Sequence, residues 1–501
     1  MSNSVTPLRQ QIIKDSTKFL SANIFARGIE ILRSVVIPVL FSPAQLGIWN
    51  LMGVIRGYGG NAQLGLLEGM NKAIPFYKIQ GKIKEMEAIK DSVFWVNLLL
   101  GLLAGSAVFI ISLFVEKKYV LSLQLVSISI FLQLIFFYLY SLLRAHHRFN
   151  LVSKGVTLLS FISTAFIIIL IFTLPNKLAG ALIGFALGYL FVNVYWFVKG
   201  KYRFPFRLSL EALRKAFGLG IPLILIGVLN MAFISIDRWV IVANLGITAL
   251  GYYSIGGMAT NLLSLVPGSI ASVLFPRWIE SYSLSQDSRS LKNLFIFPLQ
   301  AVSVITLFLV VGAVLSLTLL IQLFVPKYLP SLPIIVILIP GAFFLSLVSF
   351  AGTFIISVNR QKWQIVFFIL GSILSLFIDI ILLRRGYGII GVAYGTFIGY
   401  LFVGICTLVL AIYLATRQKI EIARVLAKIL IPYLIMAIAL AVAQLFVFEG
   451  SAPIEYIKSA GYKLVLITII ILPSLWFVYR DGELFKVLYE EFQSWLAASS
   501  K

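Results

Sequence analysis

The chain has 501 residues, of which 60% are hydrophobic and only 12% are charged, and its mean hydropathy is +1.00. Soluble domains are usually about 45–50% apolar and about 25% charged, so this composition excludes an ordinary soluble globule and predicts an integral membrane protein. The net charge of +22 does not indicate a nucleic-acid partner, because most basic residues fall in the polar segments on one side of the predicted spans. This positive-inside bias predicts cytoplasmic termini, with anionic membrane lipids as neighbours.

Fourteen stretches are mostly apolar over the roughly 20 residues that a spanning helix requires. They are 18–41, 45–66, 92–114, 119–142, 152–173, 178–198, 218–243, 249–273, 294–323, 333–356, 364–383, 389–412, 428–447 and 461–479. The links between them are too short to fold as soluble domains. The predicted fold class is therefore all-α polytopic, with about 14 transmembrane helices.

The first predicted span carries three charged residues, Arg27, Glu30 and Arg33. Their spacing of three places them on one side of a helix, where Glu30 can pair with either arginine. A charge at the bilayer centre costs at least about 2.5–3.5 kcal/mol, so such residues usually face a cavity. We predict that the two arginines bind an anionic substrate. Glu30 is a candidate for ion coupling, although clamping between two arginines favours a structural role.

The second span is unusually polar around "IRGYGGNAQLG". Arg56 lies well inside this span and is a further predicted substrate-binding residue. Five uncharged polar residues are predicted to line the same cavity, three from this run and two from later spans: Tyr58, Asn61, Gln63, Asn230 and Asn261.

The pentapeptide GYLFV occurs twice, at 188–192 and at 399–403. Each copy lies on a ladder of glycines spaced by four, a pattern that lets helices pack closely in a membrane. Close packing explains the glycines but not the identical LFV that follows them, which indicates an internal duplication. A second match has the same order along the chain: "FSPAQLGIWNL", at the start of the second span, aligns with "NLGITALGYYSI", at the start of the eighth. The first twelve spans are thus predicted to form two homologous six-helix bundles, followed by two additional helices.

The predicted organisation follows from this duplication. It comprises an N-terminal six-helix bundle at 1–200, a cytoplasmic amphipathic connector at 201–217, a C-terminal six-helix bundle at 218–415, helices 13 and 14 at 416–480, and a cytoplasmic amphipathic tail at 481–501. In the connector and in the tail, apolar residues recur on one side of a helix, as in segments that lie on a membrane surface.

The seventh span contains Asp237 and Arg238. When the two bundles are aligned, Arg33 corresponds to Asp237, so both bundles place an ionisable residue at a similar depth. We predict that Arg238 contributes to substrate binding and that Asp237 is a candidate for ion coupling. Asp379, in the eleventh span, is interpreted as part of an interfacial ion pair with Arg384 or Arg385.

The stretch Ile236–Trp278 resembles the seventh and eighth helices of bacterial polysaccharide flippases of the Wzx type. The similar features are the Asp-Arg pair, "LGYY" at the start of the eighth helix and a proline at its end, and "SPAQLGIW" resembles the corresponding turn in the first half. These flippases belong to the multidrug/oligosaccharidyl-lipid/polysaccharide exporter superfamily. The resemblance implies a location in the bacterial inner membrane and transport of lipid-linked O-antigen or capsule repeat units.

Four arginines against two deeply placed acids predict a cationic cavity, which suits a pyrophosphate because arginine forks bind phosphate oxygens in a bidentate manner. The predicted function is a flippase for undecaprenyl-pyrophosphate-linked oligosaccharides that works by alternating access. No cofactor is expected, apart from coupling to H⁺ or Na⁺. The polysaccharide polymerase and the chain-length machinery are further candidate partners.

The sequence contains neither a phosphate-binding loop of the type GxxxxGK[ST] nor a cysteine or histidine cluster for a metal, so we do not predict an enzyme. Four alternatives stay open. They are an ion-coupled exporter of small amphipathic compounds, a lipid II-type flippase, a membrane scaffold for polysaccharide assembly and a glycosyltransferase.

Overall fold

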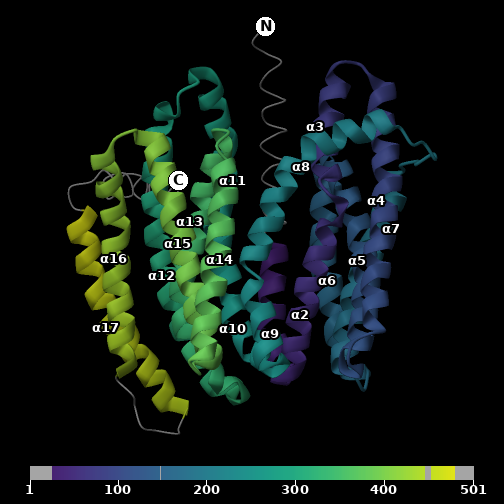
Figure 1. Cartoon of the computed structure of the whole chain (residues 1–501). Helices are drawn as coiled ribbons and strands as arrows, with labels where there is room; N and C mark the ends of the chain where they lie inside the picture. Colours follow the sequence, from purple (N-terminus) through teal and green to yellow (C-terminus); the bar gives the residue numbers. More distant parts are fainter. Residues whose placement is uncertain (1–24, 147, 446–452, 480–501) are drawn as a thin grey trace, which may run out of the picture. The chain divides into compact units, whose positions relative to one another are not determined.

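The computed structural model describes residues 25–146, 148–445 and 453–479, and every regular element within these ranges is helical (Figure 1). In the described ranges, eleven helices are long and apolar enough to cross a membrane. The predicted all-α polytopic fold is therefore confirmed. The other three predicted spans also overlap helices, at 25–40, in α2 and in α17. The predicted tail at 481–501 lies outside the described residues.

The chain divides into two compact units, Met1–Ser235 and Ile236–Lys501. The boundary falls inside the predicted span 218–243, where the helix is interrupted at Ile234 and Ser235. The first unit contains the helix at 25–40, α2 (Pro43–Gly60), η1 (Asn61–Gln63), α3 (Leu66–Ile79), α4 (Ile83–Ser112), α5 (Lys117–Ala145), α6 (Phe149–Thr173), α7 (Lys177–Gly200) and α8 (Leu210–Phe233).

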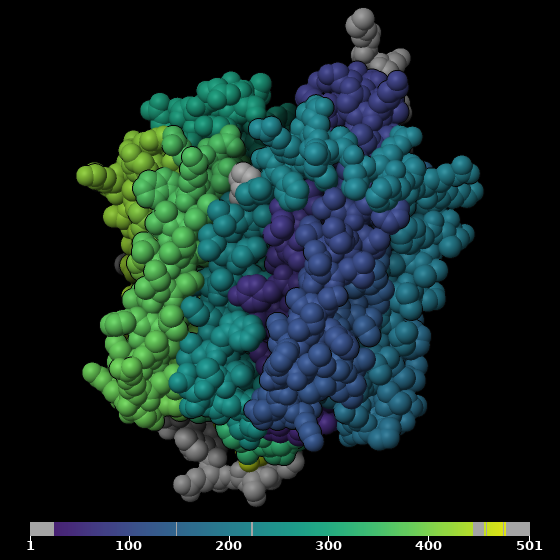
Figure 2. Space-filling model, turned by 45° about the vertical axis from the view of Figure 1, so that its right-hand side comes forward, coloured from purple at the N-terminus to yellow at the C-terminus, as the bar shows by residue number. Residues whose placement is uncertain are grey.

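In the first unit, α6 packs against α7, α4 against α5 and α3 against α8. Figure 2 shows side chains of this unit, coloured purple to teal, covering its surface on the face in view. Large apolar side chains such as those of Leu99, Phe109 and Phe161 are among the exposed ones. Exposed apolar side chains on long helices are expected where the neighbouring solvent is lipid.

The second predicted span is interrupted between α2 and α3. Ser42 and Gln45 form a capping box at the start of α2, with Pro43 at the first helical position. After η1, Leu64 and Gly65 both have positive φ, of 52° and 88°. A left-handed pair of this kind ends one helix and starts another in a new direction. The polar, glycine-rich run therefore forms a break, with α3 continuing on its far side.

The second unit contains α9 (Ile236–Leu245), α10 (Ile247–Leu263), α11 (Leu265–Ser285), η2 (Ser288–Leu291), α12 (Lys292–Phe324), η3 (Pro326–Ser331), α13 (Leu332–Ser357), α14 (Lys362–Arg384), α15 (Gly388–Thr416), α16 (Lys419–Leu445) and α17 (Pro453–Tyr479). Helix α13 is the core of this unit, because it packs against α10, α11, α12 and α15. Its phenylalanines Phe343, Phe350 and Phe354 are fully buried.

The connector predicted at 201–217 is only partly helical, since α8 starts at Leu210. The preceding residues lie on α4 (Ile83–Ser112). The rings of Phe94 and Phe204 are stacked with centroids 4.2 Å apart, and the Trp95 indole N–H donates to the Pro205 carbonyl at 3.2 Å. The aromatic side chains of this segment therefore pack against the first unit itself.

The two glycine ladders make the same kind of contact. In α7, a Cβ at Gly184 would lie 2.5 Å from the backbone nitrogen of Ile167 on α6. In α15, a Cβ at Gly391 would lie 2.8 Å from the Leu382 Cβ on α14. Each ladder thus lets the second helix of a pair approach the first, and the two copies of GYLFV lie in these two helices, α7 and α15.

Replacing Gly184 by valine should destabilise the first unit by roughly 1–3 kcal/mol, because the new side chain would overlap the backbone of α6. The expected result is a lower midpoint of thermal unfolding in detergent, measured by size-exclusion chromatography after heating. Gly312→Ala in α12 is the matched control, since nothing lies within 4 Å of a Cβ at that position. An unchanged midpoint for Gly184→Val would contradict the packing described for α6 and α7.

Candidate functional site

The charged residues of the helix at 25–40 are held by different partners. Arg27 forms an ion pair with Glu30, with Nη1 and Oε2 2.8 Å apart, and the Arg27 side chain is 58% exposed. The Ser160 hydroxyl of α6 is 3.4 Å from the second Glu30 oxygen. Arg33, which is three residues after Glu30, donates instead to the Ser163 hydroxyl of α6 at 3.2 Å. Glu30 is therefore paired with Arg27, and the hydrogen-bond partner of Arg33 is an uncharged serine.

Arg33 and Arg56 meet at one aromatic ring. The guanidinium carbon of Arg56 lies 3.7 Å from the centroid of Phe185 on α7, and that of Arg33 lies 5.3 Å from the same centroid. Tyr189, one turn later on α7, packs edge-on against Phe185 with centroids 5.3 Å apart. We call these four residues, Arg33, Arg56, Phe185 and Tyr189, the arginine–aromatic cluster.

The arginine–aromatic cluster has an unbalanced positive charge. Within the described part of the chain, neither Arg33 nor Arg56 forms an ion pair, and the nearest carboxylate, Glu30, is already bound by Arg27. Cation–π contacts contribute about 0.5–2 kcal/mol each, and they fix the orientation of a guanidinium without neutralising its charge. The donors of Arg56, and those of Arg33 that do not bind Ser163, thus stay available for an anion.

The predicted polar lining of the second span is only partly free to bind a ligand. The Tyr58 hydroxyl lies 2.9 Å from the Ser235 hydroxyl, and Asn61 donates to the Gly57 carbonyl at 3.1 Å. Gln63 is buried, donates to Glu68 at 2.9 Å and accepts from the Leu67 backbone N–H. Its amide therefore holds the turn that leads into α3. Asn230 is half-buried on α8.

In the second unit, Asp237 is buried on α9 and is held by three elements. It accepts hydrogen bonds from the Tyr253 hydroxyl of α10 at 2.5 Å and from the Arg238 backbone N–H at 2.8 Å. The Thr396 hydroxyl of α15 lies 3.5 Å from the same carboxylate and 2.8 Å from the Tyr253 hydroxyl. Arg238 itself is half-buried, and Asn261 is exposed on α10.

Asp379 does not form the interfacial ion pair that we expected from the sequence. Its side chain is 0% exposed, and neither carboxylate oxygen has a hydrogen-bond partner in the described part of the chain. A Cβ at Gly395 would overlap its Oδ1, so the carboxylate lies directly against α15, next to Thr396. The interpretation fails because Arg384 and Arg385, five and six residues later, project from other sides of the helix than Asp379.

The second unit thus contains two buried carboxylates beside neighbouring residues of α15, Asp379 next to Gly395 and Asp237 next to Thr396. We call Asp237, Asp379, Tyr253 and Thr396 the carboxylate cluster. A buried carboxylate without a cationic partner is costly, so such a site is expected to hold a proton or a metal cation. Sequence reasoning identified Asp237 but missed Asp379 as its neighbour, because their proximity depends on the packing of α9 and α14 against α15.

Comparison with known proteins agrees with this architecture. A family model described as "Polysaccharide biosynthesis protein" matches residues 39–333, which is more than half of the chain. A relative from Methanocaldococcus jannaschii, an uncharacterized membrane protein, is 24% identical over 389 residues, which cover 71% of this chain and 74% of the relative.

Two solved structures share the fold. The lipid II flippase MurJ in an inward closed conformation aligns with a TM-score of 0.64 at 18% identity, over 92% of this chain and 99% of MurJ. An inward-facing multidrug resistance MATE transporter of the MOP superfamily aligns with a TM-score of 0.63 at 15% identity, over 79% of this chain and 94% of the transporter. The resemblance noted from the Asp-Arg pair and "LGYY" is thereby confirmed, and the chain belongs to the family described as "Polysaccharide biosynthesis protein" and has the fold that these two structures share.

Proposed function

We propose that the protein is a flippase that moves undecaprenyl-pyrophosphate-linked oligosaccharide repeat units from the inner to the outer leaflet of the bacterial inner membrane by alternating access. The observation that carries this proposal is the arginine–aromatic cluster, in which Arg33 and Arg56 share Phe185 and neither is neutralised by a carboxylate.

A pyrophosphate is the anion that fits such a cluster. Its oxygens can accept paired hydrogen bonds from a planar guanidinium. Phe185 and Tyr189 are buried beside the two guanidinium groups, and they orient the arginines toward a bound anion. The polyprenyl tail carries no polar group and can remain in the lipid while the head group moves.

We further propose that the carboxylate cluster couples transport to an ion. Asp237 and Asp379 are buried, and within the described chain neither forms an ion pair. Inward movement of H⁺ or Na⁺ through this cluster would drive outward movement of the substrate. Because the outer face of the membrane is positive, outward movement of an anion is additionally favoured by about 2.3 kcal/mol per charge per 100 mV.

An ion-coupled exporter of small amphipathic compounds is the second candidate, because the carboxylate cluster would serve that activity equally well. The positive charge of the arginine–aromatic cluster argues against an exporter of cationic drugs, because Arg33 and Arg56 would repel such compounds. A lipid II-type flippase would carry a substrate with the same pyrophosphate group. The polysaccharide polymerase and the chain-length machinery are proposed partners of the flippase.

Complementation in three tester strains distinguishes these functions. One strain lacks its polysaccharide repeat-unit flippase, one is depleted of its lipid II flippase, and one lacks its drug exporters. We expect the protein to restore surface polysaccharide in the first strain and to leave the other two unchanged. Drug resistance without restored polysaccharide would contradict the proposal, as would rescue of the lipid II strain alone.

A further inference from the structure

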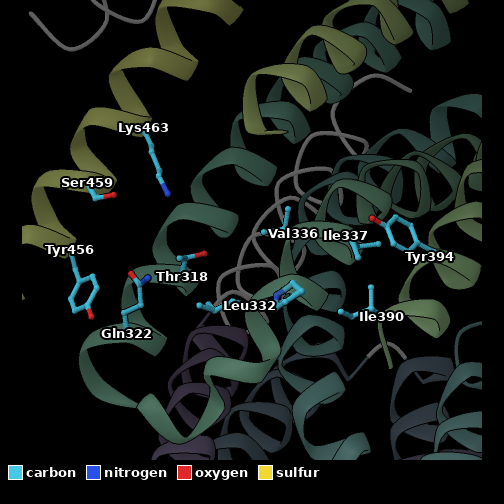
Figure 3. A pocket seen from close by; sticks show the side chains of 11 residues that line it. Thr318, Gln322, Leu332, Val336, Ile337, Ile390, Tyr394, Tyr456, Ser459 and Lys463 are labelled. Carbon is cyan, nitrogen blue, oxygen red and sulfur yellow. The ribbon is translucent and has the colours of Figure 1, made fainter. Parts of the chain in front are cut away.

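The second unit contains a pocket of about 520 Å³ that neither the arginine–aromatic cluster nor the carboxylate cluster uses. It is lined by residues of α12, α13, α15 and α17, and Figure 3 shows Lys463, Ser459 and Tyr456 of α17 along one side of it. Thr318 and Gln322 of α12 supply further polar groups. The remaining lining is mainly apolar and comes from α13 and α15.

Lys463 is the cation of this pocket. Its side chain is partly buried, and within the described residues it forms no ion pair. No aspartate or glutamate is among the described residues that line the pocket. The Thr318 hydroxyl oxygen is buried and has no hydrogen-bond partner in the described chain. The pocket therefore presents a positive charge and an unused hydroxyl next to apolar walls.

The lining residues of the four helices lie toward one end of the second unit. Thr318 and Gln322 lie near the C-terminal end of α12, and the α13 and α15 residues lie near the N-terminal ends of their helices. The α17 residues lie in the N-terminal half of that helix, where Lys463 is the eleventh of 27 residues. Lys463 is the third residue of the predicted span 461–479, and a lysine so close to the end of a span can extend its side chain to a lipid head group. With the cytoplasmic termini predicted from the positive-inside bias, this end faces the outer leaflet.

We propose that this pocket binds an anionic phospholipid of the outer leaflet. The Lys463 ammonium and the hydroxyls of Ser459 and Thr318 hold the phosphodiester, and an acyl chain lies against the apolar residues of α13 and α15. A zwitterionic lipid fits less well, because its own cation would find no acidic partner in the described lining. A bound lipid would join α17 to α12 and α13, and this role does not depend on which substrate is transported.

The test uses the purified full-length protein in detergent. Phosphatidylglycerol and phosphatidylcholine with identical acyl chains are added separately, and lipid binding is followed by native mass spectrometry and by the midpoint of thermal unfolding. We expect phosphatidylglycerol, and not phosphatidylcholine, to bind and raise the midpoint. Lys463→Gln should weaken this binding roughly tenfold, the effect of losing one hydrogen bond to a charged group. Lys458→Gln, at an exposed position of α17, should bind like the wild type.

Thr318→Val is a second variant, which retains the positive charge of Lys463. It should weaken binding of phosphatidylglycerol without changing the preference for an anionic lipid. Equal binding of the two lipids would overturn the proposal. So would wild-type binding by Lys463→Gln, or binding of undecaprenyl phosphate with no binding of phosphatidylglycerol.

Discussion

Replacing Arg56 by alanine should reduce flipping of a pyrophosphate-linked oligosaccharide roughly 10- to 100-fold. A hydrogen bond to a charged group contributes about 1.5–3 kcal/mol, and each 1.4 kcal/mol corresponds to a factor of ten. Arg56 lies 3.7 Å from the Phe185 centroid and forms no ion pair in the described chain, so its donors are available to the phosphate oxygens. Arg56→Lys should retain an intermediate activity, because it keeps the charge and loses the planar fork.

The measurement is flipping of a fluorescent pyrophosphate-linked oligosaccharide in proteoliposomes that contain equal amounts of folded protein. Arg203→Ala is the matched control, since Arg203 is an exposed arginine of the segment before α8. If Arg56→Ala flips the substrate at the wild-type rate, the arginine–aromatic cluster does not bind the pyrophosphate. A loss of the same size in Arg203→Ala would show that any missing positive charge has this effect.

Replacing Asp379 by asparagine should abolish the acceleration of transport by an ion gradient. Coupling free energies between two sites are typically 1–3 kcal/mol, which corresponds to about 5- to 150-fold in rate or affinity. Asparagine has almost the same shape as aspartate but carries no charge, so the fold should be kept. The thermal midpoint should not fall, because in the described chain the Asp379 carboxylate is fully buried without a hydrogen-bond partner.

Transport is measured in proteoliposomes with an imposed pH gradient or an imposed Na⁺ gradient, and each is compared with no gradient. The wild type should be faster with one of the two gradients, whereas Asp379→Asn should show a single rate in all three conditions. Asp287→Asn, at a loop residue between the η2 helix and α11, should respond like the wild type. A gradient response that persists in Asp379→Asn would contradict a coupling role for the carboxylate cluster.

Hydropathy predicted the spans well, because lipid imposes length and composition on every helix that crosses it. It did not predict where helices break. The span expected at 45–66 ends at Gly60 and resumes as α3 after Leu64 and Gly65 adopt positive φ. Likewise, the span expected at 249–273 is divided into α10 and α11 near Ser264. These breaks depend on a few backbone torsion angles, which barely change the mean hydropathy of a 20-residue window.

For the candidate site, the sequence could indicate charges but not their neighbours. Arg33 and Arg56 stand out because charges within apolar spans are rare. Phe185 is one of forty phenylalanines in the chain, and nothing in its local pattern marks it as the ring that both arginines contact. Asp379 was assigned to nearby arginines because they are close in sequence, whereas its actual neighbour is α15. Such contacts between distant segments come from tertiary packing.

The most direct test of the proposed function is equilibrium binding of two matched ligands to the purified protein. One is a polyprenyl-pyrophosphate oligosaccharide and the other is the same polyprenyl oligosaccharide without phosphate. The proposal predicts that only the pyrophosphate ligand binds tightly, and that Arg33→Ala and Arg56→Ala each remove most of this preference. Equal affinity for the two ligands in the wild-type protein would contradict it.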